Sequence, residues 1–102
     1  MVRERARAGD LHIPTDNELA GRATCGDVGA FDELYRRHAE AAWRVARAVT
    51  TDPHDAADAV ADAFVQIFQA LPLGRLDPGV PFRPYLLAAT RNAAIDALRR
   101  SK

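Results

Sequence analysis

The chain has 102 residues, a formal net charge of zero and 48% hydrophobic residues. This length is enough for one small domain with a single core and too short for two ordinary domains. Zero net charge argues against a histone-like protein that coats nucleic acid non-specifically, although it hides how the charges are distributed along the chain. Because β-branched runs are few and alanine and arginine are plentiful, the composition favours an all-α bundle over a sheet.

Cysteine, histidine and hydropathy patterns exclude further classes of protein. Cys25 is the only cysteine, so an internal disulfide is excluded, and His12, His38 and His54 lack the spacing of metal ligands. No apolar run approaches the roughly 20 residues that cross a bilayer, and the N-terminus lacks the apolar centre of a signal peptide. We therefore expect a cytoplasmic protein with no cofactor, no metal ion and no membrane insertion.

Helix signals begin after a polar N-terminal segment. Residues 1–14 show no sustained period, so we expect a flexible leader and assign the domain to residues 15–102. A short helix is predicted to open at Asp16 and to end before Gly26. Asp27 is a good N-cap for a longer helix.

The longer helix carries apolar residues at three- and four-residue spacing, which predicts one buried stripe. This stripe contains Val28, Phe31, Leu34, Tyr35, His38, Ala42, Val45, Ala46 and Val49. Asp52 and Pro53 then predict the N-cap and first residue of a third helix, which ends near Leu71. The stretch PLGRLDPGVPFRP holds four prolines and two glycines, so it predicts a loop, and a last helix is predicted from Tyr85 onward. The predicted fold is an all-α bundle of three main helices plus a short N-terminal helix.

The third helix is acidic, with Asp52, Asp55, Asp58 and Asp62 and no lysine or arginine. A turn of about 100° per residue places Val60, Ala63, Phe64, Ile67 and Leu71 on a core side, with Phe68 at its margin. The opposite side carries Asp55, Asp58, Asp62, Val65 and Gln69. The helix dipole explains the first two aspartates, but Asp58 and Asp62 are like charges spaced i,i+4. Two readings remain open: a solvated face, or a face that meets a basic partner.

The last helix has the opposite charge. Residues 81–102 contain Arg83, Arg91, Arg99, Arg100 and Lys102 against a single acidic residue, Asp96. The predicted outward face combines Ala88, Arg91, Asn92, Ile95 and Arg99, a mixture that suits phosphates and bases. An Asp96–Arg100 pair and the helix dipole account for the cations near the C-terminus, but not for Arg91 beside Asn92. Phe82 and Tyr85 are either core residues or platforms that stack on an unpaired base.

Three segments in this order resemble region 2 of bacterial sigma-70-type initiation factors, especially the extracytoplasmic-function group. They are EL followed by GDVGAFDELYRRH, then DPHDAADAVADAFVQIFQALP, then PFRPYLLAATRNAAIDALRR. The resemblance runs from about Glu18 to Arg100. It implies that the acidic helix docks on an arginine-rich coiled coil of the largest subunits of core RNA polymerase, through Asp58, Ala61, Asp62 and Val65. Ala61 departs from the glutamine usual in the family, so one polar contact is absent.

The same resemblance implies a single-strand binding site. The loop from Leu73 to Pro81, which includes Arg75, would cradle a base flipped out of the promoter minus-ten element. The helix from Phe82 to Arg100 would hold the non-template strand through Phe82, Arg83, Tyr85, Arg91, Asn92, Arg99 and Arg100. The implied function is a sigma factor domain that binds core polymerase and helps to melt the minus-ten element. An anti-sigma factor is a further partner that the family implies.

Two rival functions remain open. One is a helical regulator that grips duplex DNA without polymerase, and the other is a helical bundle that binds only proteins. The first would use two short helices joined by a tight turn, and the long proline-rich connection before the last helix argues against it. An enzyme is not expected, because the chain has no phosphate-binding loop, acid/base carboxylate pair or nucleophile triad. Region 4, the second domain of complete factors of the resembled type, is expected to be absent.

Overall fold

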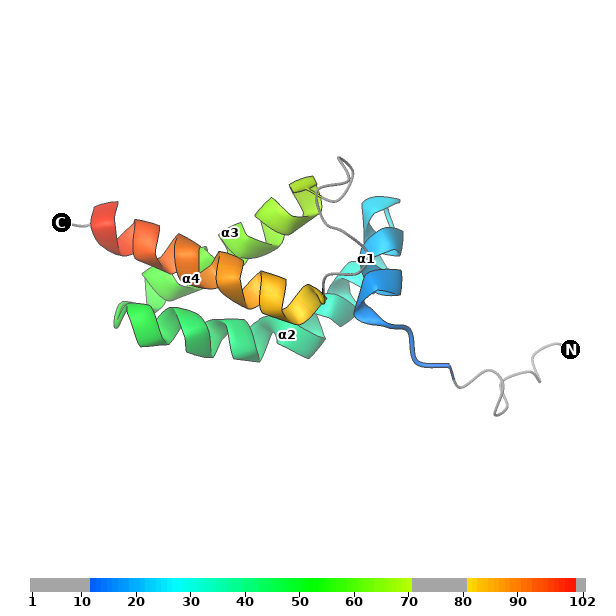
Figure 1. The fold of residues 1–102 in the computed structure, drawn as a ribbon, viewed down its shortest axis with the longest axis horizontal. Coiled ribbons are helices and arrows are strands. Elements are labelled where there is room, and N and C mark those ends of the chain that lie inside the picture. The colour runs from blue at the N-terminus through cyan, green and yellow to red at the C-terminus, as the bar shows by residue number, and fades with distance from the viewer. Residues whose placement is uncertain (1–11, 71–80, 101–102) are drawn as a thin grey trace, which may run out of the picture.

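The computed structural model describes residues 12–70 and 81–100, which form four α-helices and no strand (Figure 1). The helices are α1 (Asp16–Thr24), α2 (Val28–Val49), α3 (Pro53–Ala70) and α4 (Phe82–Arg100). The prediction of an all-α bundle with three main helices and a short N-terminal one is confirmed. Most of the expected leader, the loop that contains Arg75, and Leu71 lie outside the described residues.

Each of the first three helices begins with a side-chain N-cap. Thr15 and Glu18 form a capping box on α1: the Glu18 amide donates to Thr15 Oγ1 at 3.1 Å, and the Thr15 amide donates to Glu18 Oε1 at 2.8 Å. Asp27 Oδ1 accepts from the Ala30 amide at 3.1 Å at the start of α2. Asp52 Oδ1 accepts from the His54 amide at 2.8 Å at the start of α3. The Asp27 and Asp52 caps were predicted, and each supplies an acceptor to an otherwise unpaired helix-end amide.

The core lies where α2, α3 and α4 face one another, and α1 crosses one end of α2 (Figure 1). Its largest fully buried side chains are Phe82, Leu34, Ile67, Leu86 and Thr90. Alanines fill much of the remaining core, which allows the helix backbones to approach closely. The Thr90 hydroxyl donates to the Leu86 carbonyl at 2.8 Å, so this buried polar group has a partner.

The predicted core sides of α3 and α4 are confirmed over the described residues. Val60, Ala63, Phe64 and Ile67 are buried on α3, and Phe68 is half-buried at the margin. On α4 the buried residues include Leu86, Thr90, Ala93 and Ala97, and Ala89 is half-buried. Most of the predicted outward face of each helix is exposed, whereas Asp55 on α3 and Ile95 on α4 are half-buried.

Two expectations about helix ends and burial are wrong. Helix α4 begins at Phe82, as the family resemblance implied, and not at Tyr85, as the proline pattern predicted. Pro84 falls in the first turn, where a proline removes no intrahelical hydrogen bond. Val28 and Tyr35 were placed in the buried stripe of α2 but are 70% and 46% exposed. They lie along an open groove between α2 and α3, on a side that no described helix covers.

Candidate functional site

The outward face of α3 is acidic and unneutralised. Asp58, Ala61, Asp62 and Val65, the residues predicted to bind polymerase, are all exposed. No ion pair joins Asp58 or Asp62 to another residue within 12–70 or 81–100. The two carboxylates are one helical turn apart, and their mutual repulsion is not relieved by these parts of the chain.

The arginines of α2 behave differently, because most of them have carboxylate partners. Arg36 and Arg37 both contact Glu33, the latter at 3.0 Å. Arg44 Nη2 lies 2.7 Å from Glu40 Oε2. Three of the four arginines of this helix are therefore paired with carboxylates, which lowers the attraction of the helix for an anion.

The exposed basic residues of α4 lack such partners. Arg83, Arg91, Arg99 and Arg100 make no ion pair with any carboxylate in the described ranges. The Asp96–Arg100 pair that would have explained the C-terminal cations is not formed. Asn92 is exposed beside Arg91, and Tyr85 is half-buried. The helix thus presents to solvent an amide and guanidinium groups that no carboxylate in the described ranges neutralises, and these groups are donors for phosphates and base edges.

Phe82 does not belong to this exposed surface. Its side chain is 1% exposed, and its ring lies 5.4 Å from the His38 ring and 6.5 Å from the Phe68 ring, centroid to centroid. A ring buried on both faces has no face on which a base can stack. The expectation that Phe82 contacts DNA is wrong, and the alternative of a core position is the one observed. Arg75, also expected at the DNA site, lies outside the described residues.

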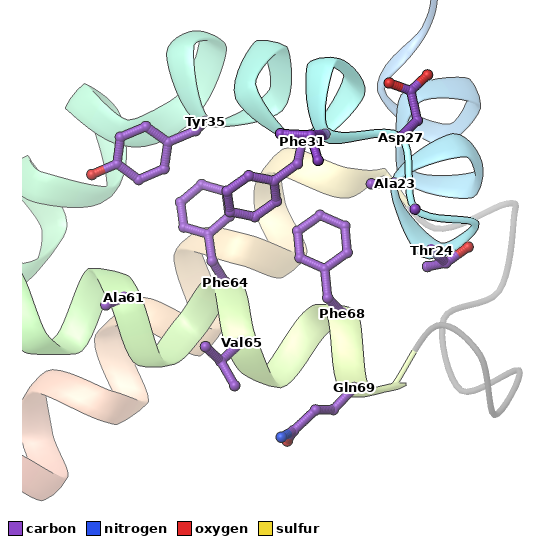
Figure 2. Close-up of a pocket in the computed structure, with 12 residues that line it drawn as sticks. Ala23, Thr24, Asp27, Phe31, Tyr35, Ala61, Phe64, Val65, Phe68 and Gln69 are labelled. Carbon is purple, nitrogen blue, oxygen red and sulfur yellow. The ribbon is translucent and has the colours of Figure 1, made fainter.

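An apolar groove of about 640 Å³ adjoins the acidic face of α3 (Figure 2). Figure 2 shows Phe31 of α2 reaching toward Phe64 and Phe68 of α3. The Tyr35 ring centroid lies 5.1 Å from that of Phe64. The Phe31 ring centroid lies 6.0 Å from that of Phe64 and 5.1 Å from that of Phe68. These aromatic contacts form the floor of the groove and hold the two helices at a fixed separation.

The groove and the acidic face share residues. Ala61 and Val65, both predicted to bind polymerase, also line the groove, and Val65 is 53% exposed. The α2 wall of the groove consists of Val28, Phe31 and Tyr35. The sequence pattern predicted these residues to be buried and did not identify them as a surface. A period of 3.6 identifies an apolar stripe, but it does not say whether another helix covers the whole width of that stripe.

A polar cluster links three helices at the start of α4. The side chain of His38 is buried, with Nε2 2.9 Å from Asp16 Oδ2 and Nδ1 3.5 Å from Arg83 Nη1. Local sequence patterns do not reveal this cluster, because 45 residues separate His38 from Arg83.

Other kinds of site find no support in the described parts of the chain. No group of three or more histidine, cysteine, aspartate or glutamate side chains is arranged there to hold a metal ion. Of the four helices, none is both long and apolar enough to cross a membrane. The arrangement is suited to binding through charge and apolar contact.

Comparison with known proteins gives consistent matches. Residues 34–102 match the family Sigma-70 region 2. The chain is 36% identical over 94 residues to the ECF RNA polymerase sigma factor SigM of Mycobacterium tuberculosis, covering 92% of this chain and 47% of that protein. It is 36% identical over 84 residues to the RNA polymerase sigma factor CnrH of Cupriavidus metallidurans, covering 82% and 43%.

A third relative is the ECF RNA polymerase sigma factor SigE of Mycolicibacterium smegmatis, 33% identical over 78 residues, covering 74% of this chain and 29% of that protein. The chain thus spans about half the length of these relatives or less. No solved structure matches it significantly.

Proposed function

The chain belongs to the sigma-70 region 2 family, and we propose that it works as the part of an RNA polymerase sigma factor that binds core polymerase and the promoter minus-ten element. Residues 15–102 are the domain that carries this function. The observation on which the proposal depends is the separation of unpaired charge: exposed carboxylates on α3 and exposed guanidinium groups on α4.

The α3 face is the proposed contact with core polymerase. Asp58 and Asp62 lack a counter-charge in the described chain, and a basic coiled coil would supply one. Ala61 and Val65 add a small apolar contact between and beside the two carboxylates. Complementary charge of this kind speeds encounter and fixes the register of docking more than it adds affinity.

The α4 face is the proposed contact with the non-template strand. Arg83, Arg91, Arg99 and Arg100 would neutralise phosphates, and Asn92 would donate to a base edge. Opening a duplex costs a few kcal/mol for each unstacked base, and capture of the displaced strand on these groups offsets part of that cost. Half-buried Tyr85 remains a candidate for stacking, whereas Phe82 is removed from the site by its burial.

The proposed mechanism needs no catalytic residue. Binding energy gained by the single strand drives strand separation, and no covalent step occurs. The pocket for an extruded base, which the family resemblance assigns to residues 73–81 with Arg75, falls almost wholly outside the described residues. It stays a prediction.

The rival function, a regulator that binds duplex DNA, is disfavoured by the charge pairing on α2. Helices α1 and α2 are joined by a short turn, residues 25–27, as such a regulator would need, although α2 has 22 residues and is not a short helix. However, Arg36, Arg37 and Arg44 on α2 are held by carboxylates, so this helix presents little positive charge to a major groove.

Two measurements on the unaltered protein test the proposal. Fluorescence anisotropy should show salt-sensitive binding to a single strand that contains a minus-ten sequence, stronger than binding to the matching duplex. Pull-down should recover core RNA polymerase. Equal binding to the single strand and the duplex would favour the regulator, and binding to neither DNA would favour the protein-interaction bundle.

A further inference from the structure

We propose that His38 is a positioning residue for strand binding: its buried ring holds the Arg83 guanidinium at the start of α4, and Asp16 fixes the ring in the tautomer that makes this possible. The inference rests on the proposed function, because it assigns Arg83 to the DNA face. It adds a residue that is itself inaccessible to DNA, since His38 is 4% exposed.

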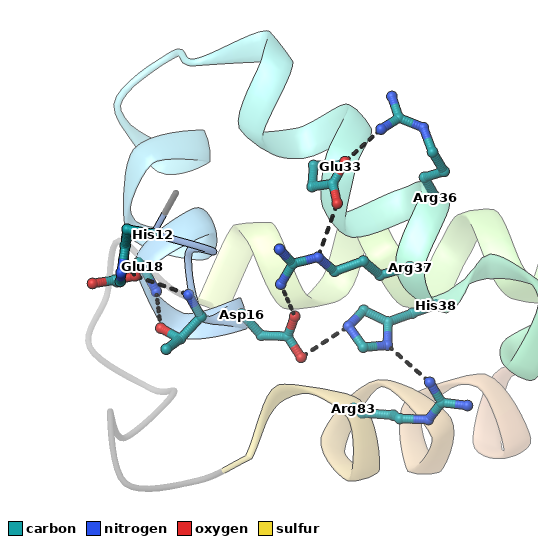
Figure 3. Close-up of polar contacts among 9 residues, drawn as sticks. His12, Asp16, Glu18, Glu33, Arg36, Arg37, His38 and Arg83 are labelled. Carbon is teal, nitrogen blue, oxygen red and sulfur yellow. Dashed lines mark hydrogen bonds and ion pairs between the residues drawn. The ribbon is translucent and has the colours of Figure 1, made fainter. Parts of the chain in front are cut away.

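The three side chains come from three helices and meet at one place (Figure 3). Asp16 belongs to the first turn of α1, His38 to the middle of α2 and Arg83 to the first turn of α4. Figure 3 shows the His38 ring between the Asp16 carboxylate and the Arg83 side chain. The distances are 2.9 Å from Nε2 to Asp16 Oδ2 and 3.5 Å from Nδ1 to Arg83 Nη1.

These neighbours determine the tautomer of the ring. A guanidinium has donors and no acceptor, so Nδ1 must offer Arg83 a lone pair. A carboxylate has acceptors and no donor, so Nε2 must carry the proton that faces Asp16. Nε2 lies 2.9 Å from Asp16 Oδ2, although the alignment of the two groups falls short of a hydrogen bond. We infer that the ring is the Nε2–H tautomer, which accepts at Nδ1.

Arg83 remains available to an anion after this contact. It has no carboxylate partner in the described ranges, and the His38 contact uses one of its guanidinium nitrogens. Its exposed side chain would otherwise sample many rotamers, and ordering one such side chain on binding is costly. A neutral acceptor reduces that cost without cancelling the positive charge, which a carboxylate would do. Arg37 shows the effect of carboxylate partners, because its positive charge is paired with Asp16 and Glu33.

Packing against Phe82 reinforces the same geometry. The His38 and Phe82 rings lie 5.4 Å apart, and Phe82 is the residue before Arg83. The ring of His38 thus contacts the side chains of two consecutive residues, Phe82 and Arg83. A histidine present only to fill the core would explain the Phe82 contact, but it would not require an acceptor at Nδ1.

Two substitutions at His38 separate the acceptor role of Nδ1 from the donor role of Nε2. In His38→Asn the side-chain oxygen takes approximately the place of Nδ1, so an acceptor for Arg83 is retained. In His38→Gln the amide reaches toward the place of Nε2, so it can donate to Asp16 while the acceptor near Arg83 is lost. Both substitutions remove the ring that packs on Phe82, and urea unfolding of each variant measures that shared structural cost.

The expected result in fluorescence anisotropy is a difference between the two variants. His38→Gln should bind a minus-ten single strand about fivefold more weakly than the wild type, and His38→Asn should bind within about twofold of it. In an Arg83→Ala background the two variants should bind equally. Equal losses in His38→Asn and His38→Gln, or a difference that persists without Arg83, would overturn the positioning role.

A second measurement does not depend on any variant folding. Long-range proton–nitrogen NMR correlation on the wild-type protein should show His38 as the Nε2–H tautomer, and a Nδ1–H tautomer would overturn the proposal. Failure of the wild type to bind the single strand would overturn both this inference and the proposed function. Normal wild-type binding with equal losses in the two variants would overturn this inference alone.

Discussion

Asp16 Oδ1 accepts a hydrogen bond from Arg37 Nη1 at 3.0 Å, and this contact ties the first turn of α1 to the middle of α2. The other oxygen of the carboxylate faces His38 at 2.9 Å. Burial alone would raise the pKa of Asp16, but the contacts with His38 and Arg37 outweigh burial and lower it below the ordinary value of 3.8. The short helix α1 is therefore held to the bundle by a charged group as well as by Leu19 and Ala20 of the core.

The lowered pKa of Asp16 predicts a pH-dependent contribution to stability. A carboxyl whose pKa is lower in the folded state stabilises the protein above its unfolded pKa, and this contribution is lost as the pH falls through the folded value. Asp16→Asn should therefore lower the free energy of unfolding by about 1 kcal/mol at pH 7, and the difference from the wild type should shrink below the unfolded value of 3.8. Urea unfolding followed by circular dichroism across this range measures it. A difference that stayed constant down to the most acidic point would mean that the Asp16 charge is not responsible.

Reversal of charge at Asp62 should strongly weaken binding to core polymerase without affecting the fold. Asp62 is exposed and unpaired within the described chain, and an arginine there would face the basic partner with like charge, which costs several kcal/mol. We expect Asp62→Arg to weaken pull-down of core polymerase by roughly a hundredfold. Asp96→Arg makes the same charge change at an exposed position of α4 and is the matched control. Equal recovery of polymerase by both variants would show that α3 is not the docking face.

Removal of the Arg91 guanidinium should weaken single-strand binding and reduce its salt dependence. Loss of one phosphate contact lowers the slope of log affinity against log salt by about 0.7 for a single strand. We expect Arg91→Ala to bind a minus-ten single strand about fivefold more weakly at moderate salt, as measured by anisotropy. Arg44→Ala, which removes a guanidinium already paired with Glu40, should bind like the wild type. An unchanged salt slope in Arg91→Ala would exclude a phosphate contact at this position.

The cap at the start of α2 should contribute measurably to stability. Asp27 Oδ1 satisfies the Ala30 amide, and loss of such a cap costs about 1 kcal/mol. Asp27→Ala should lower the urea midpoint accordingly, whereas Asp32→Ala, at an exposed position one turn into the same helix, should stay within about 0.5 kcal/mol of the wild type. Equal destabilisation by the two substitutions would show that the cap is not the cause.

The helices and their outward faces could be predicted because their signals are local. Two helix starts were predicted from their N-caps, Asp27 and the pair Asp52–Pro53. Each cap forms a hydrogen bond that spans only two or three residues. The period of 3.6 placed Val60, Phe64 and Ile67 inward and Asp58 and Asp62 outward, since side-chain direction on a helix follows from position alone. Family resemblance then connected these faces with polymerase and DNA.

Packing between helices determined which apolar side chains are buried, and the local sequence could not decide this for every residue. Phe82 had two predicted fates, and only its position against His38 and Phe68 made it a core residue. Val28 and Tyr35 matched the buried period yet remain exposed, because no described helix covers that side of α2.

Charge pairing was decided in the same way. The sequence by itself determined the helical class, the caps and the charge of each helix, because these depend on neighbours within a turn or two. Only the tertiary structure determined that Arg37 pairs with Asp16, whereas Arg83 contacts the ring of His38. Such partners lie 21 and 45 residues apart in the chain, and the packing of whole helices brings them together.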